Sequence, residues 1–354
     1  MKIAIVTCYD QNDYVRARTL RAAFKVANDV DVRIIRNENK GLKRYAEVPL
    51  KIIKTRFSYK PDAYVITFRG YEMLLFMVLT LTRKPIIFDE MINFTEWMEE
   101  HGVLQNGSLG YKLFRIWYGW LARRCRIILA DTDAHADYSA DLNKMDLKRY
   151  RTIPVGTDET VFYPRPHKAA DRKKFTIFYY GHMLPLHGLD YVLEAAEQLK
   201  DRPEITFRFV GGKDKVVQAC KAAQESGAHV THEAWVPFEE LPQAAIDAGL
   251  TLGGPFGNTL QSQFVVTGKT YQFLALGTPV LIGKNKVNDG FVDKNNCLLV
   301  PEADADAIAK AVEWAYDHPD ELEAIGKAGR QLYEQHFSQA VINADVQKLV
   351  TELS

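Results

Sequence analysis

The sequence predicts an α/β protein with two domains, each a parallel sheet covered by helices in the manner of a Rossmann fold. Three observations support this. The 354 residues exceed what one hydrophobic core accommodates and suffice for two. Short apolar runs alternate with longer segments of helical periodicity, which is the pattern of parallel strands joined by crossover helices. One proline-rich, charged segment interrupts the alternation and indicates a linker.

This linker divides the chain into two parts of similar length. We expect an N-terminal Rossmann-like domain at 1–160, the linker at 161–174 and a C-terminal Rossmann-like domain at 175–336. Residues 337–354 are predicted to form a final helix, and packing back on the N-terminal domain is one arrangement open to it. The two halves share the alternation without being sequence repeats.

Composition excludes several classes of protein. Lys plus Arg and Asp plus Glu both number 45, so no overall field draws the chain to nucleic acid or to an anionic membrane. The four cysteines lack the paired spacing of a metal site or a redox dithiol. The longest apolar run, 73–81, is far shorter than the ~20 residues that span a bilayer, and the first residues form a strand rather than a signal peptide. We expect a cytoplasmic protein, with peripheral contact at the inner membrane face as the alternative.

In the N-terminal half, each predicted strand is a short, continuous apolar run, as a sheet covered on both faces requires. The strands are expected at 3–7, 32–35, 63–67, 85–88 and 126–130. A helix at 14–26 carries Arg16 and Arg18 in its first turn, where cations oppose the helix dipole. We interpret both arginines as contacts to an acceptor substrate, with solvated side chains as the alternative.

Carboxylates follow two of these strands. Asp89 and Glu90 come directly after the strand at 85–88, at the sheet edge where open α/β sheets bind ligands. We assign them acceptor orientation or proton handling, with helix capping as the alternative. Asp131-Thr-Asp133 has the letters of a metal motif, but its position at a helix start favours capping, so no metal site is predicted. His135 is expected to be an ordinary surface histidine.

The segment 109–124 is rich in both aromatic and basic residues. One interpretation places it on a membrane surface as an amphipathic helix. We favour the other, in which its apolar face packs on the sheet and Arg123 and Arg124 complement the negative end of the helix.

The C-terminal half repeats the alternation of strands and helices. Strands are expected at 175–180, 206–210, 250–253 and 280–282. Helices are expected at 189–200, 213–226, 238–248, 303–316, 319–337 and 339–353.

A further helix, between Thr267 and Gly277, predicts an anion site at its start. Thr267 is suited to cap the first turn, and Gly277 to end the helix in the left-handed conformation. Gly268 lets a ligand approach the backbone, and Lys269 adds a full charge to the positive end of the dipole. A Walker-type loop is excluded, because Gln263 stands where that loop needs a glycine.

A second anion site is predicted at 178–190, where a strand, a glycine, a loop and a helix follow one another. Gly181 allows close approach of a ligand to the backbone. The helix after Gly188 points its N-terminus at the same place.

These two sites belong to an ordered set of motifs that resembles the retaining GT-B glycosyltransferases of the family 4 type. In the second half the set comprises Phe178 to Asp190, Phe209-Val-Gly-Gly212, Trp235 to Pro242, Leu252-Gly-Gly-Pro-Phe-Gly257, the Lys269 helix and Cys297-Leu-Leu-Val-Pro301. In the first half the resemblance rests on Arg16, Asp89, Asp131-Thr-Asp133 and Ile153 to Asp158. It implies two Rossmann-like domains facing a central cleft, the first binding the acceptor and the second a sugar nucleotide.

The resemblance also implies roles for single residues. The diphosphate is expected against Gly181, His182, His187 and Gly188 on one side and Thr267, Gly268 and Lys269 on the other. Gln272 is expected at the ribose, where family members often have glutamate, and Val236 and Pro237 near the base.

The chain departs from the family at three positions. His182 and His187 stand where many members have arginine and lysine, although one branch carries a loop like Pro185-Leu-His-Gly188. Phe264 stands where many have a glutamate that holds the donor sugar. If the histidines replace the missing cations, donor binding is expected to strengthen as the pH falls through ~7.

The implied reaction moves a hexose-type sugar from a nucleoside-diphosphate sugar to a hydroxyl acceptor with retention, in the synthesis of a cell-surface polysaccharide or glycoconjugate. The acceptor is a glycan or glycolipid. Lys269 and the helix N-termini neutralise the leaving diphosphate, so no metal or other cofactor is expected. Two alternatives remain open: a sugar-nucleotide epimerase of the same fold, and a non-catalytic subunit that binds the sugar nucleotide.

Overall fold

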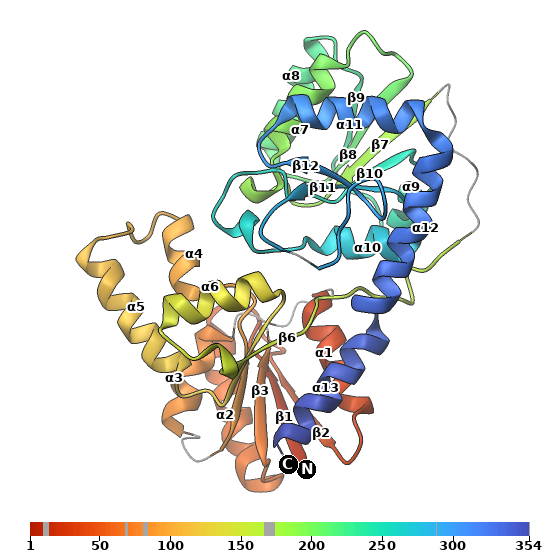
Figure 1. Ribbon diagram of the computed structural model, residues 1–354. Helices are drawn as coiled ribbons and strands as arrows, with labels where there is room; N and C mark the ends of the chain where they lie inside the picture. The colour runs from red at the N-terminus through yellow and green to blue at the C-terminus, as the bar shows by residue number, and fades with distance from the viewer. Residues whose placement is uncertain (10–13, 68–69, 81–83, 166–173, 288, 354) are drawn as a thin grey trace. The chain divides into compact units, whose positions relative to one another are not determined.

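The computed structural model describes residues 1–9, 14–67, 70–80, 84–165, 174–287 and 289–353. The chain forms two compact units, Met1–Gly156 together with Gln339–Ser354, and Thr157–Ser338. Each unit is built on a six-stranded sheet whose neighbouring strands run parallel (Figure 1). The α/β prediction with two Rossmann-like sheets is confirmed. The units divide between Gly156 and Thr157, and most of the predicted linker, 166–173, lies outside the described residues.

The first sheet has the strand order β2-β1-β3-β4-β5-β6. Its strands are β1 Lys2–Thr7, β2 Asp31–Arg36, β3 Ala63–Thr67, β4 Ile86–Asp89, β5 Ile127–Ala130 and β6 Tyr150–Thr152. The chain moves from β1 to β2 on one side and returns through β3 on the other, so the strand order reverses between β1 and β3.

Helices cover both faces of this sheet. One face carries α1 Val15–Val26 and α13 Gln339–Leu353, which lie side by side (Figure 1). The other carries α2 Arg44–Ser58, α3 Tyr71–Thr80, α4 Phe94–Glu100, α5 Leu109–Ala122 and α6 Asp133–Asn143, with the short 3-10 helices η1 Gly41–Lys43 and η2 Leu147–Arg149 beside them. Successive residues of β1 enter opposite cores: Ile3 packs with α1 and α13, and Ala4 with α2 to α6.

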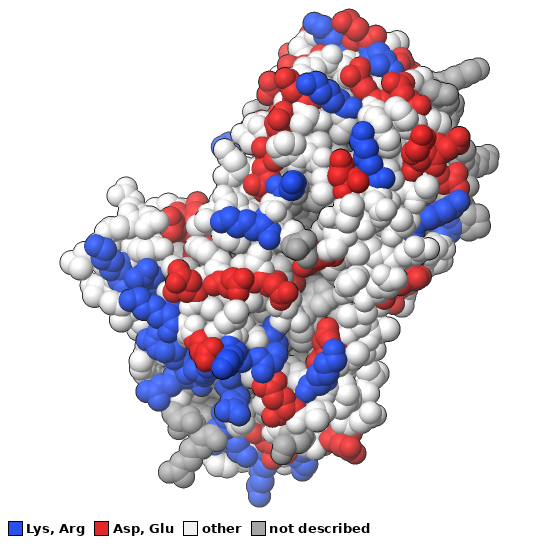
Figure 2. All heavy atoms as spheres, in the orientation of Figure 1, with Lys and Arg blue, Asp and Glu red and all other residues white. Residues whose placement is uncertain are grey.

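Charge is distributed unevenly over the surface of this first unit. Lys and Arg side chains gather over the side that carries α2, α3 and α5, whereas a row of acidic side chains lies over α6 (Figure 2). The balanced charge of the whole chain therefore hides a local segregation.

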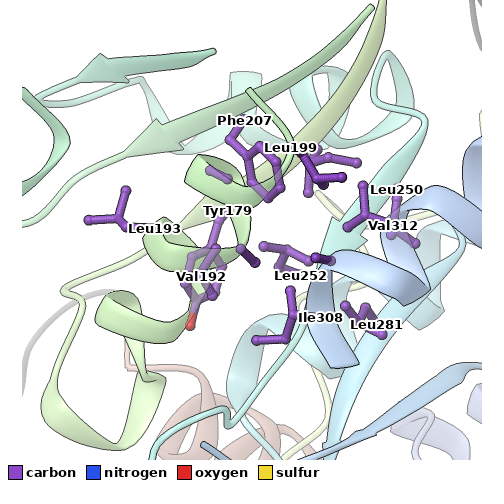
Figure 3. Packing of buried hydrophobic residues seen from close by; sticks show 14 of the residues in the cluster. Tyr179, Val192, Leu193, Leu199, Phe207, Leu250, Leu252, Leu281, Ile308 and Val312 are labelled. Atoms are coloured by element: carbon purple, nitrogen blue, oxygen red, sulfur yellow. The ribbon is translucent and has the colours of Figure 1, made fainter. Parts of the chain in front are cut away.

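The second sheet has the order β12-β11-β10-β7-β8-β9. Its strands are β7 Phe175–Tyr180, β8 Ile205–Val210, β9 Val230–Glu233, β10 Leu250–Leu252, β11 Val280–Lys284 and β12 Leu298–Pro301. Its helices are α7 Leu189–Gln198, α8 Asp214–Glu225, α9 Leu241–Ile246, α10 Gly268–Leu276, α11 Ala305–Asp317 and α12 Pro319–His336, with 3-10 turns η3 Pro185–His187, η4 Phe238–Glu240 and η5 Gln261–Gln263. Strand residues such as Leu252 and Leu281 pack against Val192 of α7 and Ile308 of α11 (Figure 3).

Three strands were not predicted: β6, β9 and β12. All three are edge strands. An edge strand is only partly covered, so polar residues replace the apolar run that marks a central strand in β6 and in Val230-Thr-His-Glu233 of β9. Strand β12, Leu298-Leu-Val-Pro301, is apolar but has only 4 residues. Among the described residues, no helix combines the length and the apolar character needed to cross a bilayer.

Candidate functional site

The residues predicted to bind a diphosphate lie at one edge of the second sheet. The chain leaves β7 toward β8 and β9 on one side and returns through β10 on the other. This reversal makes the carboxyl ends of β7 and β10 the position where open α/β sheets bind ligands. Gly181 follows β7 and Gly253 follows β10.

The loop after β7 has room for a ligand at its first residue. Gly181 has φ +134°, a conformation that residues with a side chain rarely adopt. Among the described residues, a Cβ there would meet only His187 Cε1, at 3.9 Å. By contrast, a Cβ on Gly211, after β8, would lie 2.5 Å from the carbonyl oxygen of Gly181. The neighbouring loop therefore supports Gly181 from one side and leaves the other side open.

The end of the same loop is held by backbone contacts. Gly188 has φ +63° and occupies the N-cap position of α7. A Cβ on Gly188 would lie 2.4 Å from the carbonyl carbon of Phe256, and one on Gly257 would lie 2.3 Å from the carbonyl oxygen of Pro185. The loop after β7 thus rests directly on the loop after β10, and glycine is required on both sides of the contact.

Thr267 stands at the N-cap position of α10 but does not cap it. Its hydroxyl donates to the carbonyl oxygen of Gly253 at 2.6 Å, so the capping role predicted for this side chain is wrong. The first N–H groups of a helix have no intrahelical partner unless a cap supplies one, and the side chain of the N-cap residue Thr267 makes no such hydrogen bond. A Cβ on Gly268 would meet nothing within 4 Å. The start of α10 therefore keeps both the donors and the space that an anion needs.

Lys269 is a buried cation, with 6% of its surface exposed. Its Nζ lies 5.0 Å from the centroid of the Tyr179 ring, and within the described parts of the chain no carboxylate forms an ion pair with it. Burial lowers the pKa of Lys269 to about 7. A lysine held in this way gains from an anionic partner, because the anion restores the charged form that burial disfavours.

His187 does not supply a second charge in the free protein. Burial, then Lys269 and His182, lower its pKa to about 2, so its ring is neutral at physiological pH. Its Nδ1 accepts from the N–H of Leu184 at 3.2 Å and shapes the loop. His182 is exposed. The cation at this site is therefore Lys269 rather than His187.

Gln272 lies one turn after Lys269 on α10 and is also buried. Its Oε1 accepts from the hydroxyl of Tyr180, so its amide nitrogen is the group it can offer to a ribose hydroxyl. No role for Tyr180 was predicted from the sequence; its contact with Gln272, 92 residues away, appears only in the fold. Val236 is buried and Pro237 half-buried after β9, at the same edge of the sheet.

Phe264 stands where many family members have a glutamate, and it offers an apolar ring instead of a carboxylate. The side chain is buried, and Lys286 Nζ lies 4.9 Å from its ring centroid. Beside it, Val265 and Val266 line a cavity of about 250 Å³ together with Lys284 and Lys286.

The chain is similar to known glycosyltransferases. Residues 192–344 match a family model described as glycosyl transferase-like. The putative colanic acid biosynthesis glycosyltransferase WcaL of Escherichia coli (strain K12) is 25% identical over 244 residues, which cover 67% of this chain and 59% of WcaL. The match therefore spans less than two thirds of that relative.

Solved structures resemble the whole chain. HepE from Anabaena, in complex with UDP-glucose, superposes with a TM-score of 0.75 at 14% identity, covering 99% of this chain and 100% of that one. Sucrose-phosphate synthase from Thermosynechococcus elongatus gives 0.75 at 16% identity, covering 100% and 99%. The fold is GT-B. A glycosyltransferase from Rickettsia africae ESF-5 has the same likeness, with a TM-score of 0.70 at 13% identity over 99% and 98% of the two chains.

In the N-terminal unit of this GT-B chain, Arg16 and Asp89 form a buried ion pair. Arg16 Nε donates to Asp89 Oδ1 at 2.9 Å, and neither side chain has any exposed surface. The remaining donors of Arg16 bond the carbonyl oxygens of Ile153, Pro154 and Ala130. Arg16 therefore ties α1 to the sheet edge and presents no donor to an acceptor substrate in this structure.

Arg18 lies on the same helix and is half-buried. Its contact with an acceptor stays a prediction.

Glu90 lies inside a polar network rather than at a helix cap. It is 1% exposed and accepts from the hydroxyls of Tyr118, at 2.6 Å, and Ser139, while Asn93 and Asn143 each donate at 3.3 Å. Burial raises its pKa. The cap of α4 is Asn93, which accepts from the N–H of Thr95 at 2.9 Å, so the capping alternative for Glu90 is wrong.

Asp131 and His135 form a second buried pair beside this network. His135 Nδ1 lies 2.7 Å from Asp131 Oδ1, its Nε2 has no partner among the described residues, and 2% of its surface is exposed. The expectation of a surface histidine is therefore wrong. Thr132, not an aspartate, caps α6, accepting from the N–H of His135 at 3.1 Å, and Asp133 accepts from Thr152. The spacing of four residues between Asp131 and His135, across the junction of a strand and a helix, is the sequence pattern that could have predicted this pair.

The buried His135 makes the stability of this unit depend on pH. Burial alone would lower the pKa of His135, but the hydrogen bond to Asp131 and the nearby Glu96 and Glu90 raise it to about 9. Because the folded pKa lies above the ordinary value of 6.5, this group's stabilisation is complete below pH 6.5 and is lost as the pH rises through 9. Glu96, whose pKa burial raises to about 8, contributes with the same sign.

We expect the free energy of unfolding to fall more steeply between pH 6.5 and 9 in the wild type than in His135→Gln. Urea unfolding of both full-length chains across this range measures the difference. The comparison is needed because Lys269, with its lowered pKa, shifts stability in the opposite direction in the other unit. Equal slopes in the two proteins would contradict the assignment.

Proposed function

We propose that this protein is a retaining, GT4-like hexosyltransferase that moves a sugar from a nucleoside-diphosphate sugar to a hydroxyl of a glycan or glycolipid acceptor. The observation that carries the proposal is Lys269, a buried cation with no carboxylate ion-paired to it in the described residues, at the open start of α10. The complex of HepE with UDP-glucose supports a sugar nucleotide as donor, and the similarity to WcaL, described as a putative colanic acid biosynthesis glycosyltransferase, supports a polysaccharide pathway.

The chemistry follows from where charge develops. When the bond between the sugar C1 and the diphosphate oxygen breaks, negative charge grows on the leaving diphosphate. Lys269 and the N–H groups at the start of α10 are fixed positive groups at that position. The acceptor oxygen forms the new bond to C1 on the same face, and its proton passes to the departing phosphate. This scheme needs neither a protein base nor a metal ion.

A thermal-shift panel of nucleoside diphosphates and their sugars tests the donor. At least one nucleoside diphosphate is expected to raise the melting temperature, since a ligand that binds only the folded chain stabilises it. The preferred donor is then incubated with the protein with and without glycan acceptors. Transfer only with an acceptor supports the proposal, a new sugar nucleotide from donor alone indicates an epimerase, and binding without turnover indicates a non-catalytic subunit. No shift with any member contradicts the donor site.

Two glycine substitutions separate ligand contact from folding. Gly268→Ala is expected to leave stability unchanged or slightly raised, because the added methyl meets no atom of the described residues within 4 Å and alanine favours helix. It is expected to weaken nucleoside diphosphate binding about tenfold or more, because that space is where the phosphate approaches the backbone. Calorimetric titration and thermal melting measure the two effects.

Gly188→Ala is the matched control for a glycine that the fold itself requires. Its added carbon would lie within 2.5 Å of the backbone at Phe256 and Gly257, and φ is positive. A loss of about 2–5 kcal/mol in stability is expected. If Gly268→Ala binds the diphosphate as tightly as the wild type, the ligand does not lie against the start of α10.

A further inference from the structure

Helix α5 has apolar residues on two opposite faces. Tyr118 and Leu121 are buried in the core that this helix forms with the sheet, as the interpretation of 109–124 as a packed helix expected, and Tyr111 is buried on the same side of the helix. A second apolar stripe faces solvent. Its members and exposed fractions are Leu109 73%, Leu113 58%, Ile116 62%, Trp117 39% and Trp120 37%. A surface helix normally has one apolar stripe, so the second indicates a partner.

The neighbouring helices of the same layer extend this exposed stripe. On α2, Leu50, Ile53 and Phe57 are 66%, 42% and 70% exposed, at spacings that place them on one side of the helix. On α3, Leu75 and Leu79 are 39% and 64% exposed. Helix α2 contacts α3, and α3 contacts α5. We call the outward face of these three helices the α2–α3–α5 surface.

Basic residues accompany the apolar ones on this surface. The segment 40–60 contains seven basic residues and one acidic residue: Lys40, Lys43, Arg44, Lys51, Lys54, Arg56 and Lys60 against Glu47. The segment 109–126 contains five basic residues and no acidic one: Lys112, Arg115, Arg123, Arg124 and Arg126. Figure 2 shows Lys and Arg side chains gathered over this side of the unit.

An acidic border limits the surface at α6. Asp133, Asp137 and Asp141 are exposed and follow one another at every fourth residue, so they form one stripe on this helix. Helix α6 contacts α5, and the row of acidic side chains over α6 is visible in Figure 2. The positive, apolar area therefore has a defined edge rather than fading into a mixed surface.

We propose that the α2–α3–α5 surface docks on a lipid bilayer containing anionic headgroups. Exposed leucine, isoleucine and phenylalanine side chains enter the boundary between headgroups and acyl chains, and tryptophans lie at this boundary by preference. The lysines and arginines beside them attract the anionic headgroups. The proposal goes beyond the proposed transfer reaction and does not depend on it.

The charge distribution favours a bilayer over a second copy of the chain. A symmetric dimer through this surface would bring the basic segments of the two copies together, and like charges at an interface oppose association. An anionic bilayer complements both the apolar and the basic residues at once.

The test is sedimentation of the full-length protein with vesicles. We expect it to sediment with vesicles of phosphatidylcholine mixed with phosphatidylglycerol, not with phosphatidylcholine alone, and to be released as salt is raised. The double variant Leu113→Ser/Ile116→Ser is expected to weaken binding about tenfold or more, and Lys54→Glu/Lys112→Glu to abolish the preference for anionic lipid. All four side chains are exposed, so folding is preserved.

Matched controls are Val217→Ser/Val292→Ser, at exposed apolar positions of the second unit, and Lys221→Glu. They are expected to bind vesicles as the wild type does. The proposal is overturned if the α5 variant binds as tightly as these controls, if the wild type ignores anionic vesicles, or if the stripe instead mediates a dimer, seen in analytical ultracentrifugation and lost in Leu113→Ser/Ile116→Ser. The thermal shift caused by the preferred nucleoside diphosphate is expected to be the same in all of these variants. It therefore tests the proposed donor binding separately from vesicle binding.

Discussion

Lys269→Ala is expected to weaken nucleoside diphosphate binding by about 10- to 100-fold, which corresponds to about 1.5–3 kcal/mol for a hydrogen bond to a charged group. Lys269 is buried and has no carboxylate ion-paired to it in the described residues, so the diphosphate provides the partner that the fold does not. Calorimetric titration of both proteins measures the change. Lys221→Ala, at a lysine whose side chain is 73% exposed, is the matched control and is expected to bind as the wild type.

The same lysine sets the pH dependence of binding. Its pKa in the free protein is about 7, and a bound diphosphate raises it, so above pH 7 binding takes up a proton. Affinity is therefore expected to fall as the pH rises from 7 to 9, by at most about tenfold per pH unit. The terminal phosphate is already ionised over this range, because its second pKa is ≈ 6.

Two variants identify the titrating group. In Lys269→Ala the pH dependence above 7 is expected to disappear. In His187→Ala it is expected to remain, because the pKa of His187, lowered to about 2, keeps that ring neutral throughout. A profile that is flat in the wild type, or that His187→Ala abolishes, would show that Lys269 is not the responsive cation. A loss of less than tenfold at pH 7 in Lys269→Ala would mean that the diphosphate lies elsewhere.

Asp89→Ala is expected to reduce the free energy of unfolding by about 3–5 kcal/mol, because it leaves the buried guanidinium of Arg16 without its carboxylate. Both side chains are fully buried, so water does not take the place of the lost carboxylate. Urea unfolding of the full-length chain measures the effect. Removing both charges, as in Arg16→Met/Asp89→Leu, is expected to recover most of this loss.

The double variant also tests whether Asp89 acts in catalysis, the role assigned from the sequence. If the pair is only structural, the folded double variant transfers sugar at a rate near that of the wild type. If the double variant is folded and binds the donor but does not transfer, Asp89 takes part in the reaction. Recovery of neither stability nor activity would show that the contacts of Arg16 with the carbonyl oxygens of Ile153 and Pro154 are what the fold needs.

The local sequence pattern determined much of the secondary structure of this protein. The central strands and the helix from Gly268 to Leu276 were predicted within a residue or two, because apolar periodicity and glycine are properties of neighbouring residues. The same holds for Gly181 and Gly188, where a strand, a turn and a helix start are written in sequence order. A candidate anion site built from helix starts and glycine loops is therefore visible without coordinates.

Tertiary structure decided which side chains meet. Arg16 was expected to contact an acceptor substrate, but it pairs with Asp89, 73 residues away, and only the sheet order brings the two together. Likewise, Thr267 turned out to bond Gly253 rather than its own helix. A hydrogen bond or an ion pair depends on the distance between two groups. In this fold, that distance is determined by how strands remote in sequence pair with one another.

Burial was decided in the same way. The sequence indicates which residues of α5 share a stripe, but both of its stripes are apolar, and only the packing of α5 on the sheet shows which one stays exposed. His135 was likewise expected at the surface, but only 2% of it is exposed in the fold. Periodicity determines the face on which a side chain lies, whereas the neighbour that covers that face is a property of the whole fold.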